Sequence, residues 1–386
     1  MHIPDYYEFV NQTKIISGKS SLEHIPVELD GYDTRKPLVI TTGALTRRGI
    51  AKKFIKAFYD SDVVLGAFYD AVHGYAGITQ VRELAGLFRD RGCDSIIAIG
   101  GGEVVDVAKG VNLLVSEKTD TLMPYCDGTA VPGRLKPFLY VPTCHSTGME
   151  MTGTATVDNQ TMTSDFLIPD LVVIDPRMTV GCCSECVAET AAVALAHAVG
   201  AALDETRSPM TEAYSHSALQ SLAGNLAKGI KKPKNGAASV GLANAAVMAT
   251  VAFSNAPAGM AHLLSEELAK ASGLSIGKHL RILLPPVMDR IAGQKNKFRN
   301  EMLLAIAGMD AYAATPEKDR AGAGIQKALQ LLQPIAKVMP GSLKELKIQK
   351  YLLPEIAEKA SKKSGKRFSG ADCMAVLERA WEGMPV

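Results

Sequence analysis

Apolar and polar residues follow two different patterns along the chain, and the first of them fills the N-terminal half. Short runs of β-branched and other apolar residues alternate there with stretches whose apolar residues recur at helical spacing. The pattern predicts buried strands at Pro37–Thr42, Asp62–Phe68, Ser95–Ile99, Phe138–Val141 and Leu171–Ile174, and helices near 46–59, 80–91 and 104–114. Strands that alternate with helices indicate βαβ units and a mostly parallel sheet, which binds ligands at the carboxyl ends of its strands.

From about Ser184 the pattern changes to long stretches rich in Ala and Leu, without continuous β-branched runs. Helical spacing predicts helices at Val187–Asp204, Thr211–Lys228, Ala237–Ser254, Ala261–Ser272, Arg299–Ala313 and Ala323–Val338. The sequence therefore predicts an α/β nucleotide-binding domain over residues 1–183, followed by an all-α domain over residues 184–386.

The composition excludes several classes of protein. The 386 residues include 42 Lys and Arg against 40 Asp and Glu, so the net charge of +2 gives no overall electrostatic basis for nucleic-acid binding. No apolar run reaches the ~18–20 residues of a membrane span, and the N-terminus lacks the basic and apolar regions of a signal peptide. We therefore expect a cytoplasmic protein without a membrane partner. The Lys-rich segment Lys344–Lys366 is interpreted as a solvated helical surface.

Seven cysteines in a chain of this length do not form the pattern of a disulfide scaffold. Three of them, Cys182, Cys183 and Cys186, cluster near the expected domain boundary. We interpret these as reduced, partly buried thiols, with zinc binding or oxidant sensing as the alternatives.

A glycine triplet, Gly100–Gly102, stands between a predicted strand and a predicted helix. Glycines at such a turn let a phosphate approach the backbone, and the free N–H groups at the start of the helix favour an anion. A tight strand-to-helix turn also requires glycine without any ligand. Asp106 and Lys109 on the following helix favour the phosphate interpretation, although the spacing is not the GxGxxG of the dinucleotide fingerprint.

The segment from Gly100 to Lys109 resembles the GGGxxxDxAK signature of iron-containing (group III) alcohol dehydrogenases. Further family motifs are matched in order by TKIISG (Thr13–Gly18), VPTCHSTGMEMT (Val141–Thr152), IPDLVVIDPRMT (Ile168–Thr179), ALAHAVGAALDE (Ala194–Glu205) and LRILLPPVM (Leu280–Met288). The resemblance implies a dehydroquinate synthase-like architecture, with an N-terminal domain that binds NAD or NADP and an all-helical domain that holds metal and substrate. It also implies a homodimer.

The resemblance assigns the cofactor to Gly100, Gly101, Gly102, Glu103, Asp106, Thr143, Cys144, Thr147 and Thr42. Two of these positions depart from the family. Glu103 replaces a Ser, and a carboxylate there repels pyrophosphate unless it turns to solvent or to a cation. Thr42 replaces the Asp that holds the adenosine ribose. Without that carboxylate, and with Arg47 and Arg48 close behind, NADP becomes an alternative to NAD; the simpler interpretation is that both arginines are exposed helix charges.

The family's divalent metal, Fe or Zn, is held by one Asp and three His, and this chain matches two of the four positions. His197 and His262 match, whereas the other two positions carry Val193 and Ile276, which cannot coordinate a metal. A further active-site His of the family is replaced by Glu266.

Three interpretations of this altered metal site remain open. In the first, metal is not bound tightly, and His197 and His262 donate protons or polarise a carbonyl directly, as in maleylacetate reductases. In the second, Glu266, four residues after His262 on the same helical face, replaces a lost ligand, with His279 as a weaker candidate. In the third, the chain is a catalytically impaired structural relative.

We therefore expect an NAD(P)-dependent oxidoreductase that interconverts a small alcohol and an aldehyde or ketone by hydride transfer. His197 and His262 would polarise the substrate oxygen, directly or through a metal, and Glu266 would relay the proton. The alternatives are a metal-independent carbonyl reductase resembling maleylacetate reductase and the impaired relative.

Overall fold

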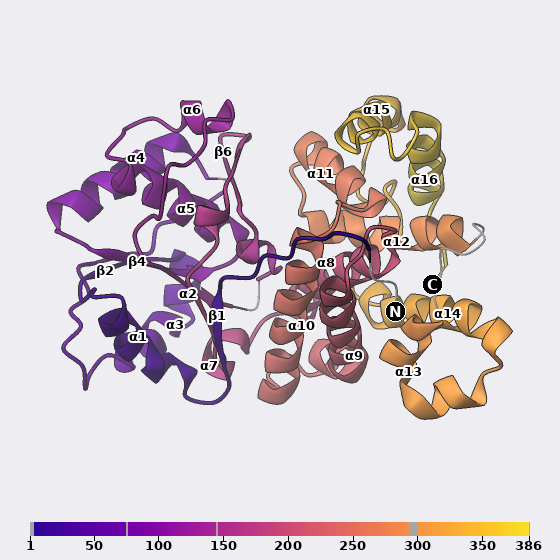
Figure 1. Ribbon diagram of the computed structural model, residues 1–386, viewed down its shortest axis with the longest axis horizontal. Helices are drawn as coiled ribbons and strands as arrows, with labels where there is room; N and C mark the ends of the chain where they lie inside the picture. Colours follow the sequence, from indigo (N-terminus) through magenta and orange to yellow (C-terminus); the bar gives the residue numbers. More distant parts are fainter. Residues whose placement is uncertain (1–3, 75, 144–145, 293–299, 386) are drawn as a thin grey trace. The chain divides into compact units, whose positions relative to one another are not determined.

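The computed structural model describes residues 4–74, 76–143, 146–292 and 300–385. The chain forms two compact units, an α/β unit over Asn11–Cys182 and a helical unit over Cys183–Val386 that also includes the residues before Asn11 (Figure 1). The inclusion of these first residues in the α/β domain is therefore corrected. The Val10 amide donates to the side-chain oxygen of Asn255 at 2.6 Å, and the side-chain nitrogen of Asn255 donates back to the Val10 carbonyl at 2.9 Å.

The α/β unit is built on a six-stranded sheet whose five strand pairs are all parallel. The strand order is β1 (Lys14–Ser17), β8 (Leu171–Ile174), β5 (Phe138–Pro142), β4 (Ser95–Gly100), β2 (Pro37–Ile40) and β3 (Ala67–Tyr69). The four inner strands consist entirely of buried residues. Near-continuous apolar runs of this kind are expected where helices cover both faces of a parallel sheet.

Helices α4 (Ile78–Asp90) and α5 (Gly102–Ser116) lie on one side of the sheet, and α1 (Ile25–Gly31) and α3 (Ile50–Lys56) lie on the other (Figure 1). Shorter helices are α2 (Gly43–Arg47), α6 (Met123–Cys126) and α7 (Pro176–Thr179). The predicted alternation of strands and helices is confirmed, and with it the expected fold class of the N-terminal half.

Two local predictions in the α/β unit are wrong, and one element of the unit was not predicted. The strand predicted at Asp62–Phe68 is confined to Ala67–Tyr69, because the preceding residues form a loop whose Val63 joins the core without joining the sheet. The helix predicted near 46–59 is divided into α2 and α3 by Gly49, which has φ of 77°. The sequence pattern also misses a β-hairpin, β6 (Thr154–Val157) with β7 (Gln160–Thr163), whose turn residues Asp158 and Asn159 both adopt positive φ, as a type I′ turn requires.

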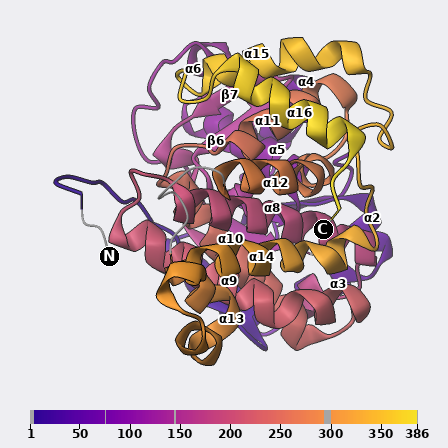
Figure 2. The same cartoon turned by 90° about the vertical axis from the view of Figure 1, so that its right-hand side faces the viewer.

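The helical unit packs its long helices around α8, as Figure 2 shows with this unit facing the viewer. Its helices are α8 (Ser184–Leu203), α9 (Pro209–Lys231), α10 (Gly236–Ser254), α11 (Met260–Ser272), α12 (Ile276–Ala292), α13 (Glu301–Ala314), α14 (Glu317–Ala336), α15 (Leu353–Lys363) and α16 (Gly370–Glu382). Alanines dominate the buried face of α8, which lets α9, α10 and α12 approach it closely. All six helices predicted for this half are present. The bounds of α12, α15 and α16 were not predicted.

Two helices, α8 and α10, are long and apolar enough to span a membrane by length and composition alone. Within their most apolar windows, 72% of the residues of α8 and 56% of those of α10 are buried inside the structure. Packing in the core of the helical unit therefore accounts for their composition.

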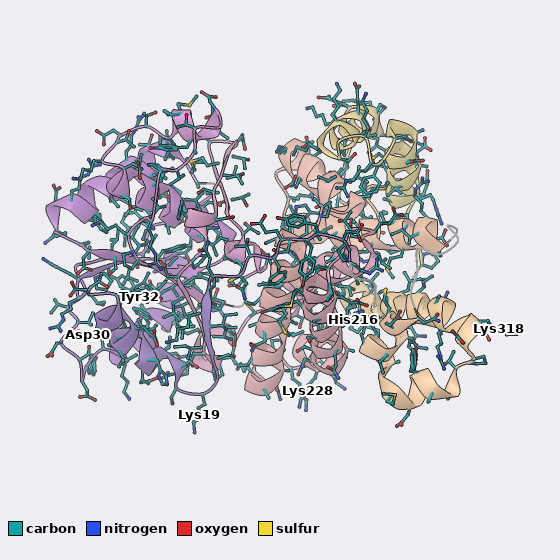
Figure 3. The ribbon with its side chains drawn as sticks, in the orientation of Figure 1. Lys19, Asp30, Tyr32, His216, Lys228 and Lys318 are labelled. Atoms are coloured by element: carbon teal, nitrogen blue, oxygen red, sulfur yellow. A yellow bond between two sulfur atoms is a disulfide. The ribbon has the colours of Figure 1, made fainter. Side chains whose placement is uncertain are left out.

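Charged side chains such as Lys228 and Lys318 are exposed on the surface of the helical unit (Figure 3). The Lys-rich segment follows the same rule, because α15 carries the exposed ion pairs Glu355–Lys359 and Glu358–Lys362 one helical turn apart. The solvated helix predicted within this segment is confirmed.

Helix α12 begins in close contact with the backbone of α8, and this contact yields a test of the packing. A Cβ atom added at Gly277 would lie 2.7 Å from the carbonyl oxygen of Glu189, so we expect Gly277→Ala to lower the free energy of unfolding by about 1–3 kcal/mol. Gly224 in α9 is the matched control, because a Cβ there meets nothing within 4 Å and Gly224→Ala should raise stability by up to about 1 kcal/mol. Chemical unfolding measures both variants, and a Gly277→Ala protein as stable as the parent would contradict the close contact.

Candidate active site

The glycine turn lies at the carboxyl edge of the parallel sheet, where the strand order changes direction. From β2 the chain moves outward to β3, then returns past β2 to β4 and continues to β5 and β8. The point between β2 and β4 is thus the topological switch point, at which open α/β sheets bind ligands. The Thr41 hydroxyl donates to the Ile99 carbonyl at 2.8 Å and ties the ends of these two strands together.

The start of α5 is open toward an anion. Its N-cap residue, Gly101, makes no side-chain capping bond, and a Cβ at Gly102 would meet no atom within 4 Å. Glu103, whose carboxylate would repel a pyrophosphate, is exposed, so its side chain can turn to solvent. Gly100 is required for packing, because a Cβ there would lie 2.6 Å from Val104 Cγ2. These features fit a phosphate at the turn.

Thr143, the next predicted cofactor residue, follows β5 directly beside the glycine turn. Its hydroxyl is buried and has no hydrogen-bond partner among the described residues, so a ligand group there would satisfy it. Thr147 donates its amide to Glu150 Oε1 at 3.2 Å. Cys144 lies outside the described residues. Two residues that the sequence did not indicate fix the turn, since the hydroxyls of Tyr140 and Ser146 donate to the Gly100 carbonyl at 3.0 and 2.8 Å.

Asp106 and Lys109 connect α5 to the β6–β7 hairpin. Asp106 accepts the Thr156 amide at 3.2 Å, and the buried ammonium of Lys109 donates to the carbonyls of Thr152 and Thr154 at 2.7 and 2.9 Å. Burial raises the pKa of Asp106 to about 6 and lowers the pKa of Lys109 to about 8. The pair therefore holds the first strand of the hairpin against α5.

Thr42 caps α2, because its side chain accepts the Leu45 amide at 3.4 Å. The two arginines that follow it differ in their surroundings. Arg48 donates to the Gly181 carbonyl. Arg47 is exposed, and its guanidinium lies beside Gly43, where an added Cβ would be 3.2 Å from Nη1.

The predicted catalytic residues come together in the helical unit as a chain of hydrogen bonds. His197 Nδ1 lies 3.2 Å from the Thr250 hydroxyl, and its Nε2 lies 3.2 Å from His262 Nδ1. His262 Nε2 in turn lies 3.2 Å from Glu266 Oε1. The ring of Phe253 stacks on His197 with 4.1 Å between centroids and holds the imidazole in place.

Burial and a lysine far away in the sequence determine the charges of these hydrogen-bonded residues. Burial lowers the pKa of His197 well below its usual value, so this ring is neutral near pH 7. Burial raises the pKa of Glu266, but the bonds from His262 and Lys363 outweigh it and lower that pKa to about 2. Lys363 Nζ lies 3.1 Å from Glu266 and 2.5 Å from Glu267, a pairing that no sequence motif indicates.

The donor set does not fit a tightly held divalent metal. Glu266 binds the ring nitrogen of His262 that faces away from His197, so the three groups lie in line and do not converge on one point as metal ligands must. Val193 is fully buried. His279 pairs instead with the Ser272 hydroxyl at 3.2 Å, which gives no support to its role as a substitute ligand. Within the described part of the chain, no three His, Cys, Asp or Glu side chains form a metal-binding group.

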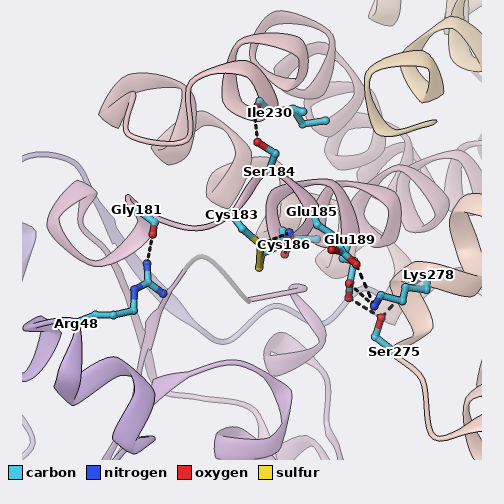
Figure 4. The surroundings of a disulfide bond; sticks show 11 residues. Arg48, Gly181, Cys183, Ser184, Glu185, Cys186, Glu189, Ile230, Ser275 and Lys278 are labelled. Carbon is cyan, nitrogen blue, oxygen red and sulfur yellow. Dashed lines mark hydrogen bonds and ion pairs between the residues drawn. A yellow bond between two sulfur atoms is a disulfide. The ribbon is translucent and has the colours of Figure 1, made fainter. Parts of the chain in front are cut away.

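Cys183 and Cys186 form a disulfide at the start of α8 (Figure 4). Cys183 is the N-cap and Cys186 the third residue of the helix, and this spacing brings the two side chains together on one face. The expectation of reduced thiols is therefore wrong for these two residues.

Comparison with known proteins gives a consistent family match. Two family models cover most of the chain, "Iron-containing alcohol dehydrogenase" over residues 12–176 and "Fe-containing alcohol dehydrogenase family, C-terminal" over residues 187–375.

Individual relatives and solved structures are similar at lower identity. The probable alcohol dehydrogenase EutG of Escherichia coli is 33% identical over 218 residues, a match that spans 55% of each chain and thus about half of that relative. The 1,3-propanediol dehydrogenase of Klebsiella pneumoniae is 26% identical over 87% of each chain. A crystal structure of 1,3-propanediol oxidoreductase superposes with a TM-score of 0.86 at 22% identity, over 97% of this chain and 100% of that one.

Proposed function

Because the chain belongs to the iron-containing alcohol dehydrogenase family, we propose that it is an NAD(P)-dependent oxidoreductase that interconverts an alcohol and an aldehyde or ketone. The relatives named above are alcohol dehydrogenases, in agreement with the activity expected from the sequence. The observation that carries the proposal is the hydrogen-bonded chain from His197 through His262 to Glu266.

The α/β unit would hold the dinucleotide. The open N-terminus of α5 at Gly101 and Gly102 fits the pyrophosphate, and the hydroxyl of Thr143, which has no partner among the residues that the structure describes, is available beside it. Bound NAD(P) supplies or accepts the hydride. Glu103 is exposed, so its carboxylate can turn to solvent and away from the phosphates.

The helical unit would move the proton. An imidazole can release one proton from one ring nitrogen as it receives another on the opposite one, so His197 and His262 can exchange a proton with the substrate oxygen while Glu266 holds the far nitrogen of His262. The pKa of about 2 keeps Glu266 ionised, so its carboxylate orients His262 and stabilises a proton held on that ring, while it is itself a weak proton acceptor. Lys363 connects this carboxylate to the surface of the unit.

A second candidate, a metal-independent carbonyl reductase, is favoured by the same in-line arrangement. The residues present do not converge on a metal, so no step is assigned to one. Without a Lewis acid, oxidation of an unactivated alcohol loses several kcal/mol of transition-state stabilisation, and reduction of an activated carbonyl becomes the easier direction.

The test combines cofactor titration, elemental analysis and turnover of the purified full-length protein. We expect NADH or NADPH to bind, an aldehyde to be reduced, and activity to survive exhaustive treatment with a chelator. Stoichiometric Fe or Zn that is lost on His262→Ala would contradict the metal-independent candidate. Failure of both dinucleotides to bind would contradict the oxidoreductase proposal and leave the structural relative.

The homodimer implied by the resemblance stays a proposal, as does the cytoplasmic location. Light scattering coupled to size exclusion measures the mass in solution, and a mass equal to one 41.1 kDa chain would contradict the dimer.

A further inference from the structure

A cavity of about 330 Å³ opens within the helical unit beside His262. Its volume is at the lower end of the roughly 300–1,000 Å³ typical of small-molecule sites. The side chains that line most of it are apolar and come from α8, α10 and α12, namely Val199, Leu203, Phe253, Leu284, Val287 and Met288. Of the proposed proton chain, His262 thus lines the cavity, beside a mainly apolar surface that also includes charged side chains.

Among the lining residues that the structure describes, each cationic side chain is already held in an ion pair. Arg290 pairs with Asp372 at 2.7 Å, and Arg367 pairs with Asp204 at 3.5 Å. Glu205 adds a further carboxylate to the lining. A substrate carboxylate, sulfonate or phosphate would have to displace one of these ion pairs, which costs free energy because the guanidinium must exchange one anion for another.

We propose that this cavity binds the hydrocarbon chain of the substrate, so that the preferred substrate is an uncharged alkyl alcohol or aldehyde longer than two carbons. The inference rests on the proposed function and narrows the class of substrate. Each methylene group that enters an apolar cavity contributes about 0.8 kcal/mol, which corresponds to roughly a fourfold rise in kcat/KM per methylene.

Gly200 offers a way to fill the cavity without disturbing the helix. It lies in α8 on the cavity wall, and a Cβ there would meet no atom within 4 Å. A leucine side chain at this position would therefore extend into the space proposed for the alkyl chain. Gly224 in α9 is the matched control, because it is also an open helical glycine but lies away from the cavity.

The experiment measures kcat/KM of the full-length protein for acetaldehyde, butanal and hexanal, with NADH and with NADPH, and for 4-oxobutanoate as the anionic counterpart of butanal. We expect a rise of roughly fourfold per methylene in the parent and in Gly224→Leu, and a loss of this rise in Gly200→Leu. A flat or falling dependence on chain length, or a preference for 4-oxobutanoate over butanal, would overturn the inference.

Binding of hexan-1-ol by calorimetry tests the cavity independently of turnover. Binding by the parent and Gly224→Leu, with at least tenfold weaker binding by Gly200→Leu, supports the proposed site. Equal binding by all three proteins, or no binding by the parent, would overturn it. Dinucleotide binding without turnover of any aldehyde would instead count against the oxidoreductase proposal, and the calorimetric result would still decide the cavity.

Discussion

Replacement of His262 by asparagine is expected to lower kcat by about 10²–10⁴-fold, the usual contribution of a positioned acid or base. His262 is the middle of the proton chain, with one ring nitrogen 3.2 Å from His197 and the other 3.2 Å from Glu266. Asparagine has no conjugated ring that can accept a proton on one nitrogen and release one from the other, so proton transfer through this position is interrupted. Steady-state kinetics with the best aldehyde measures the effect.

The control for this prediction is His216→Asn, which changes a half-buried histidine of α9 outside the proton chain (Figure 3). Both variants should bind NADH or NADPH with unchanged affinity, because the proposed dinucleotide contacts belong to the α/β unit. A His262→Asn protein with kcat within a factor of three of the parent would remove His262 from the mechanism.

Replacement of Lys109 by methionine is expected to lower the free energy of unfolding by about 3–5 kcal/mol. The Lys109 ammonium is buried and donates to the carbonyls of Thr152 and Thr154. Its positive charge also lowers the pKa of Asp106, against the effect of burial. Without it, both carbonyls lose a donor and the carboxylate of Asp106 is left without a cation. Methionine keeps most of the apolar stem, so the loss reports the charge and its hydrogen bonds.

The pH dependence of this loss has a defined sign. Burial raises the pKa of Asp106 in the folded protein to about 6, above its usual value of 3.8, so stability falls as the pH rises between these two values. Removal of Lys109 raises that pKa further. The deficit of Lys109→Met should therefore be larger near pH 8 than near pH 5, and Asp106→Asn in the same protein should recover part of it.

Urea unfolding followed by circular dichroism measures these differences, with the exposed Lys52→Met as the control. Trp381, the single tryptophan, lies in α16 of the helical unit. A shift seen by circular dichroism but not by tryptophan fluorescence would locate the loss in the α/β unit. Equal stability of the Lys109→Met and Lys52→Met proteins would show that the buried ammonium is dispensable.

The sequence predicted the parts of the site that depend on local spacing. A strand that runs into three glycines and a helix can form only a short turn, so the turn at Gly100–Gly102 followed from the residues alone, while phosphate binding there stays a prediction. His197 and His262 followed from their places in family motifs, and the structure brings their rings within 3.2 Å. The fold class followed from the change of pattern at about Ser184.

The remaining parts depend on contacts between residues far apart in the chain. Lys363 lies 97 positions from Glu266, in a segment whose other lysines are ordinary surface charges, so no local pattern separates it from them. Tyr140 and Ser146 act on the Gly100 carbonyl through the pairing of β4 with β5. The in-line order of His197, His262 and Glu266 is likewise a matter of ring orientation, which spacing along a helix does not determine.

The two hydrogen bonds between Val10 and Asn255 affect the order in which the two units can fold during synthesis. The chain leaves the helical unit after Val10 and returns to it at Cys183, so the α/β unit is an insertion within the helical one. During synthesis the α/β unit can complete its sheet as soon as β8 has emerged, whereas the first residues must wait for α10 before their partner exists. Truncation of residues 4–10 should therefore weaken the helical unit, whose sequence lies almost entirely at the other end of the chain.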